Sequence, residues 1–99
     1  MIPVVVRHRA EADLEKARAW YAREDEQLGF RFSKEFSATV DRIAALPDQF
    51  PEVGNGVRRA LLHNFPYTTY FIRRENVAVC HRGSSPTSAT RRLETSGET

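Results

Sequence analysis

AEADLEKARAWYAREDEQLGFRFSKEFSATVDRI, from Ala10 to Ile43, encodes two amphipathic helices, and its pattern determines the architecture of the chain. Apolar residues recur at i, i+4, i+7 and i+11 in its first half and at i, i+4, i+8 and i+11 in its second half, which is the spacing of one buried helical face. Leu28-Gly29-Phe30 supplies a glycine between the two, so we predict that the chain reverses there into a helical hairpin. The two stripes are Ala10, Leu14, Ala17 and Tyr21, followed by Phe32, Phe36, Val40 and Ile43.

A strand and a loop flank this hairpin. Ile2–Arg7 is short and β-branched, and because Val4-Val5-Val6 is apolar on both faces, we expect it at the centre of a sheet. Pro47 ends the second helix, and the prolines, glycines and asparagine of Pro47–Gly56 predict a loop.

Three further segments have strand character: Val57–Leu62, Tyr67–Arg74 and Val77–Cys80. The order β-α-α-β-β-β favours an α+β fold in which the helical hairpin packs on one face of a mainly antiparallel sheet. Apolar content almost vanishes from Gly83 onward. We therefore expect one domain over residues 1–83 and a disordered or aberrant tail over residues 84–99.

Composition excludes several classes of protein. With 99 residues and 40% hydrophobic content, the chain has room for one globular core. No apolar stretch approaches the roughly 20 residues needed to cross a bilayer, and the N-terminus does not resemble a signal peptide, so we expect a cytoplasmic protein with no membrane partner. Cys80 is the only cysteine, and a core position is expected for it. The three histidines are not paired at metal-ligand spacing, so neither a metal site nor a cofactor is predicted.

Positive charge gathers on the predicted sheet, because Val57–Arg82 holds five arginines and a single acid. Arginines can hold phosphates bidentately and tyrosines can stack on bases, so one interpretation is a surface that binds a target or nucleic acid. Another is that the arginines are solvated or paired with acids and that the tyrosines pack against the helices. The candidate binding residues are Arg58, Arg59, Tyr67, Arg73, Arg74 and Arg82, with Tyr70 beside them.

A metal-free ribonuclease would need an acid or base and a cation near the phosphate. The candidate catalytic residues for such an activity are Arg58, Arg59 and His81, with Tyr67 as a further acid–base candidate. In the alternative interpretation, His81 only caps a strand.

A series of short motifs resembles the RelE/ParE toxin superfamily, and specifically its ParE-like branch of plasmid stabilisation proteins, over about residues 3 to 79. They appear in the family's order and spacing, and the series is more specific than any one motif. They are Ala12-Asp13-Leu14 with Ala19-Trp20-Tyr21, Leu28-Gly29-Phe30-Arg31-Phe32, Ile43 with Leu46-Pro47-Asp48-Gln49-Phe50-Pro51, Val57-Arg58-Arg59-Ala60-Leu61-Leu62, and Phe65-Pro66-Tyr67 leading into Tyr70-Phe71.

This resemblance implies the same β-α-α-β-β-β fold, a cognate antitoxin and growth arrest as the outcome. ParE-type members poison DNA gyrase, whereas RelE-type members cleave messenger RNA on the ribosome. The chain lacks the lysine-rich, tyrosine-ended set of the RNA-cleaving branch, so a ParE-like toxin without catalysis is expected. The alternatives are a RelE-like endoribonuclease acting on mRNA and an inactivated toxin that only binds antitoxin.

The C-terminus departs from the family from about Cys80. Family members continue with a pattern such as Ala-x-x-His-x-x-Arg-x-Pro-x-x-Trp, whereas this chain turns to Ser/Thr-rich sequence. Codons can be chosen for Cys80–Thr99 so that loss of one base yields AIAAHRRQARPEDWKRAGR, which fits the family ending. A frameshift is therefore our hypothesis, and the coding DNA tests it.

Overall fold

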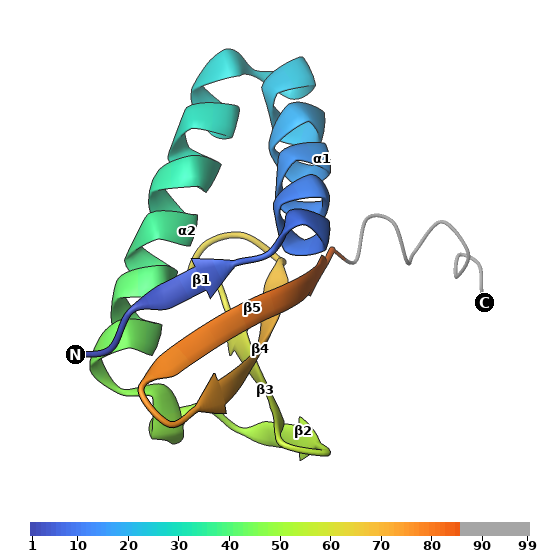
Figure 1. The fold of residues 1–99 in the computed structure, drawn as a ribbon. Coiled ribbons are helices and arrows are strands. Elements are labelled where there is room, and N and C mark those ends of the chain that lie inside the picture. The colour runs from blue at the N-terminus through green and yellow to red at the C-terminus, as the bar shows by residue number, and fades with distance from the viewer. Residues whose placement is uncertain (86–99) are drawn as a thin grey trace.

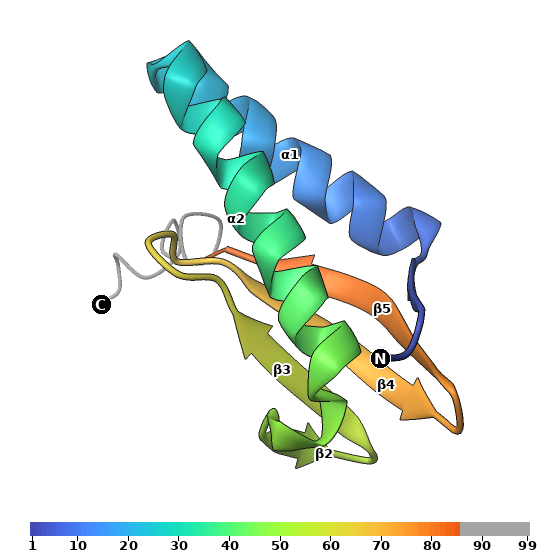
Figure 2. The same ribbon diagram turned by 90° about the vertical axis from the view of Figure 1, so that its left-hand side faces the viewer.

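Two antiparallel helices lie on one face of a five-stranded sheet whose strand order is β1-β5-β4-β3-β2 (Figures 1 and 2). The computed structural model describes residues 1–85. The predicted α+β class and the helical hairpin are confirmed. The elements are β1 (Val4–Val6), α1 (His8–Glu24), α2 (Glu26–Ala45), a 3-10 turn η1 (Pro47–Gln49), β2 (Glu52–Gly54), β3 (Val57–Leu61), β4 (Thr68–Arg74) and β5 (Val77–Ser84).

The sheet is mixed but mostly antiparallel, since only β1 pairs in parallel, with β5. The expectation that the first strand is central is wrong, because β1 forms an edge of the sheet. Val5, in the middle of β1, points away from the helices and is 48% exposed. Apolar residues on both faces of a strand indicate that the two faces are shielded from solvent. They do not indicate whether the strand has one neighbouring strand or two.

The region predicted as a loop, Pro47–Gly56, contains the turn η1 and the short strand β2. β2 forms a hairpin with β3, and its turn carries positive φ angles at Gly54, Asn55 and Gly56. The Gly56 N–H donates to Glu52 Oε2 at 2.9 Å, which ties the turn to the strand. The signal for this hairpin was the Gly-Asn-Gly sequence, because glycine and asparagine tolerate positive φ at low cost.

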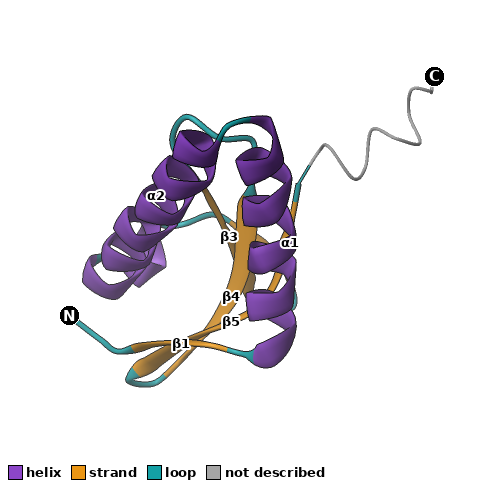
Figure 3. Ribbon diagram, turned by 90° about the horizontal axis from the view of Figure 1, so that it is seen from above, coloured by secondary structure: helices purple, strands orange, loops and turns teal. Residues whose placement is uncertain are grey.

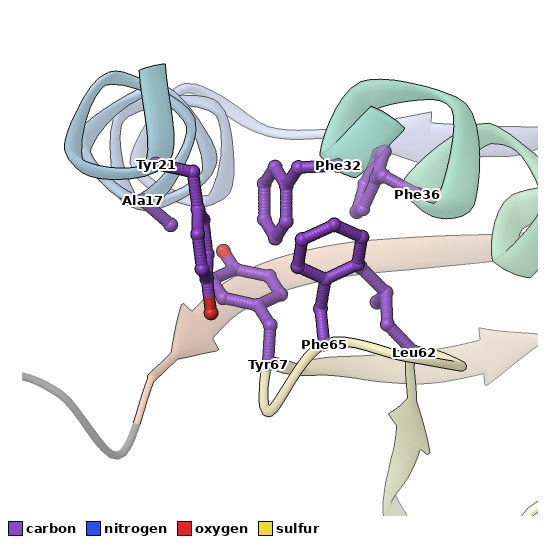
Figure 4. Close-up of a cluster of buried hydrophobic side chains, with 7 residues drawn as sticks. All are labelled: Ala17, Tyr21, Phe32, Phe36, Leu62, Phe65 and Tyr67. Carbon is purple, nitrogen blue, oxygen red and sulfur yellow. The ribbon is translucent and has the colours of Figure 1, made fainter. Parts of the chain in front are cut away.

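The predicted helical stripes form the core. Phe32 and Ile43 are completely buried, and each belongs to one of two clusters between the helices and the sheet. In the first cluster the Phe32 ring packs edge-on against Tyr67, with ring centroids 5.2 Å apart (Figure 4). Seen from above, both helices lie along the same side of the curved sheet (Figure 3). The first cluster contains Ala17, Tyr21, Phe32, Phe36, Leu62, Phe65 and Tyr67, and the second contains Ala10, Ile43, Ala60, Phe71, Ala78 and Cys80.

The helices meet at Asp25, which ends α1 and caps α2 by accepting a hydrogen bond from the Gln27 N–H at 3.0 Å. The reversal therefore precedes the position predicted from Gly29, which lies inside α2. Gly29 serves close packing instead, because a Cβ at this position would lie 2.8 Å from Ala22 Cβ on α1.

β5 continues past Cys80, where the predicted strand ended, and reaches Ser84. Gly83 pairs with Thr69 and Ser84 pairs with Thr68 on β4. Strand pairing uses backbone groups, so it extends into sequence without apolar side chains. Ser84 and Ser85 of the expected tail thus belong to the described fold, and residues 86–99 lie outside the described residues.

Gly29→Ala is expected to lower the free energy of unfolding by about 1–3 kcal/mol, because the added methyl group overlaps Ala22. Helix propensity alone predicts the opposite sign by roughly 1 kcal/mol. Chemical denaturation checks this, with Ser37→Ala at an exposed position of α2 as the control. The double variant Ala22→Gly/Gly29→Ala should recover part of the loss, and a stabilised Gly29→Ala protein would contradict the close packing.

Burial raises the pKa of the Cys80 thiol above its ordinary value, against a smaller opposite effect of the hydrogen bond with Thr69. The unfolded chain therefore loses the thiol proton first as pH rises. The thiol's contribution to stability is present below its ordinary pKa and is lost as pH rises through the raised pKa. Denaturation of the wild type and of Cys80→Ala between about pH 7 and pH 10.5 should show the difference in their unfolding free energies shrinking with pH. A constant difference would contradict the burial effect.

Candidate functional site

The sheet face opposite the helices, here called the outer face, carries a row of three polar side chains. Arg59 on β3 lies directly opposite Tyr70 on β4, and Tyr70 lies opposite Arg82 on β5. Directly opposite residues of antiparallel strands point to the same side of a sheet. The Tyr70 hydroxyl also lies 3.5 Å from Ser84 Oγ. We call these three residues the Arg–Tyr–Arg row.

A second row on the outer face is apolar and crosses four strands. Val57 lies opposite Ile72, Ile72 opposite Val79, and Val79 opposite Val5. These four residues are here called the apolar row. Both helices of the described chain lie on the other face of the strands that carry it (Figure 3). The outer face thus combines apolar area with arginine and tyrosine, which is typical of the centre of a protein-binding surface.

Arg82 belongs to the row by its pairing with Tyr70, but its side chain extends to Asp13 on α1 and so leaves the outer face towards the helices. Asp13 Oδ2 accepts hydrogen bonds from Arg82 Nε at 3.0 Å and from the Gly83 N–H at 2.9 Å. The Arg82 side chain is 52% exposed, so its terminal nitrogens can still reach a ligand. The row therefore holds one arginine oriented by an acid and one, Arg59, that is exposed.

Arg58 and Arg73 point to the other side of the sheet. Arg58 Nη1 donates to the carbonyl oxygens of Phe50 at 2.6 Å and Asp48 at 3.4 Å. Arg73 Nη1 lies 3.7 Å from Asp48 Oδ2. Both arginines hold the segment after α2 against the sheet, so of the candidate binding residues these two lie on the other face from Arg59. Arg74 is exposed beside the turn at Glu75 and Asn76.

Tyr67 is a core residue and not a surface residue. Its side chain is 2% exposed, and its hydroxyl fills the space where Gly83 has no side chain. Burial, with the charge of Asp13 as a smaller effect, raises the pKa of its phenol far above the ordinary value. At this burial the Tyr67 ring has no free face on which a base could stack, so the structure places it in the core and not in the predicted binding surface. Tyr70, and not Tyr67, is the tyrosine that lies on the outer face of the sheet.

His81 lies on β5, which β4 separates from the strand of Arg58 and Arg59. It is an additional residue in β5, since Phe71 pairs with Cys80 and Tyr70 pairs with Arg82. His81 Nδ1 is buried and has no hydrogen-bond partner among residues 1–85. The predicted catalytic candidates therefore do not converge on one point.

Alternation along β3 and β4 could have separated these residues in advance. Ala60 and Phe71 are completely buried, so neighbours two residues away share their side and neighbours one residue away face outward. The bulge at His81 gives no comparable signal in the sequence.

Within residues 1–85, no cluster of three or more metal-ligating side chains occurs, and no helix is long and apolar enough to cross a membrane.

Comparison with known proteins places this geometry in a family. Residues 4–84 match the family model described as ParE toxin of type II toxin-antitoxin system, parDE. The match runs past Cys80 to the end of β5. The comparison with curated sequences gave no match.

The fold is also that of a solved structure titled "Chromosomal ParDE TA system from P. aeruginosa". The TM-score is 0.74 at 18% sequence identity, and the similarity covers 86% of this chain and 96% of that chain. Because the family model spans most of the sequence, from β1 to the end of β5, the chain belongs to the ParE toxin family of type II toxin–antitoxin systems.

Proposed function

We propose that this ParE toxin arrests growth by binding a protein target through its outer face, and that the target is DNA gyrase. The observation that carries the proposal is the Arg–Tyr–Arg row beside the apolar row, on a sheet face that neither helix of residues 1–85 covers. Tyrosine and arginine on a partly apolar surface are the residues that contribute most to protein–protein affinity. The ParE family membership favours gyrase over the ribosome as the target.

The arrangement of the candidate catalytic groups supports binding without RNA cleavage. General acid–base catalysis needs the reacting groups within hydrogen-bond reach of one substrate. Arg58 is bonded to two backbone carbonyls, and Tyr67 is buried. His81 lies two strands from Arg59, roughly 10 Å at the spacing of a sheet.

The proposed partner that neutralises the toxin is a cognate antitoxin of the ParD kind. Two features support a docking surface away from the outer face. Phe30 is 64% exposed beside a groove between α1 and α2 that Arg18 and Ser33 also line. β2 is an edge strand of the sheet formed by the described residues, and an extended segment could add to that edge as a further strand. A gene for a small DNA-binding protein next to the toxin gene would identify this partner.

Induced expression without antitoxin tests the proposed function. We expect filamentous cells and a DNA-damage response, with intact transcripts, and we expect the purified protein to inhibit supercoiling by gyrase. Transcripts that are cleaved soon after induction would favour the endoribonuclease alternative. Harmless expression together with retained antitoxin binding would favour the inactivated toxin and reject growth arrest by this chain.

Arg59→Ala and Tyr70→Ala are expected to weaken gyrase inhibition roughly tenfold or more, because they truncate the centre of the proposed surface. Their unfolding free energies should stay within about 1 kcal/mol of the wild type, since both side chains reach solvent. Titration of gyrase inhibition with each purified variant measures the effect. Arg31→Ala, an exposed arginine on α2, is the matched control and should inhibit like the wild type.

Arg58→Ala should show the opposite pattern. Loss of the donor to the Phe50 and Asp48 carbonyls should lower the unfolding free energy by about 1–2 kcal/mol. Under conditions where the variant stays folded, its gyrase inhibition should match that of the wild type. Equal stability of the Arg58→Ala and Arg59→Ala proteins would contradict the different roles of these adjacent arginines.

A further inference from the structure

The β-bulge in β5 places two consecutive side chains at one cavity. In a regular strand, His81 and Arg82 would point to opposite faces. The additional residue at His81 shifts the register, and both side chains line a cavity of about 420 Å³ beside the start of α1. Bulges commonly redirect a side chain next to a functional site. The bulge therefore brings a histidine and an arginine together where strand geometry alone would separate them.

The other side of this cavity is the first turn of α1. Arg7, His8 and Arg9 line it, and Arg7 is the N-cap residue without a side-chain capping bond. The Arg7 N–H donates to the Cys80 carbonyl at 3.0 Å, which holds the helix start against β5. The first N–H groups of a helix lack partners within the helix, and the helix dipole adds partial positive charge there.

Every residue that lines the cavity in the described chain is an arginine or a histidine. Two acids of α1 contact residues that line the cavity: Glu11 Oε1 lies 3.9 Å from His8 Nδ1, and Asp13 Oδ2 accepts a hydrogen bond from Arg82 Nε. The side chains of Arg7 and Arg9 form no ion pair within residues 1–85. The buried His81 Nδ1 is likewise without a partner in this part of the chain. Arg7 and Arg9 thus supply positive charge at the cavity that no acid of the described residues pairs with.

We propose that this cavity binds a phosphate group, held by Arg7, Arg9 and Arg82, which line it together with His81. Guanidinium groups match phosphate oxygens bidentately, and a helix N-terminus next to them favours an anion. The phosphate can belong to a small phosphorylated compound or to the backbone of a nucleic acid strand. Arg82 belongs both to this cavity and to the Arg–Tyr–Arg row. The proposal still does not depend on gyrase as the target, because it is tested by phosphate binding with variants at Arg9 and His81, which are not part of that row.

Titration of ¹⁵N-labelled protein with inorganic phosphate locates the site. We expect amide shifts at residues 7–10 and 80–82, and a dissociation constant that rises roughly tenfold in Arg9→Gln and in His81→Gln. Arg31→Gln, on the exposed face of α2, is the control and should bind like the wild type. Because Arg9 is exposed, its variant tests the site even if His81→Gln is destabilised. Shifts that are absent, lie elsewhere or persist unchanged in Arg9→Gln would overturn the proposal.

A fluorescent single-stranded oligonucleotide then distinguishes the two sources. If a backbone phosphate occupies the cavity, affinity falls with salt, and Arg9→Gln reduces the slope of log K against log salt concentration by about one, which Arg31→Gln does not. If the oligonucleotide binds without any effect of Arg9→Gln while inorganic phosphate still shifts the amides, the site takes a small phosphorylated compound. Loss of both responses in the wild type would refute phosphate binding.

Discussion

Phe32 and Ile43 are completely buried between α2 and the sheet, one in each core cluster, and they set the position of both layers. The Phe32 ring contacts the ring of Tyr21 on α1. It also contacts the rings of Phe65 and Tyr67, which both lie in the segment between β3 and β4. Aromatic rings in edge-on contact bury large area with specific geometry. This packing joins the helical hairpin to the sheet over a single face.

One-sided packing has a direct consequence for function. A small domain has too few apolar residues to cover both faces of a sheet. The helices take one face, and the outer face is left with residues that can meet solvent or a partner. Val5 is 48% exposed and Leu61 is 59% exposed on that face, so apolar area remains there beside Arg59 and Tyr70. The surface that we propose to bind gyrase follows from the way in which the core is built.

The sequence predicted the helices well. The apolar stripe from Phe32 to Ile43 repeats over several turns, and this spacing fits a helix and not a strand. It predicted the sheet surface less well. Tyr67 and Tyr70 have the same chemistry and lie three positions apart, but one is in the core and the other is in the Arg–Tyr–Arg row. Tyr67 comes directly before β4 and Tyr70 lies within it, so their separation depends on where the strand begins and on which of its alternating positions face the core. The edge position of β1 and the bulge at His81 depend on pairing between distant segments, which a local pattern does not contain.

The register of β5 is therefore the feature on which the candidate sites most depend. Without the additional residue at His81, Arg82 would change faces and the row across Tyr70 would be lost. Two contacts act against such a slip. Asp13 binds both Arg82 Nε and the Gly83 N–H, and the Tyr67 hydroxyl occupies the space that only a glycine leaves free. A residue with a side chain at the position of Gly83 would collide with Tyr67, so the core itself selects the bulged pairing. The buried tyrosine that was predicted to contact a target instead packs against Gly83, and it thereby supports the register of β5 on which the position of Arg82 depends.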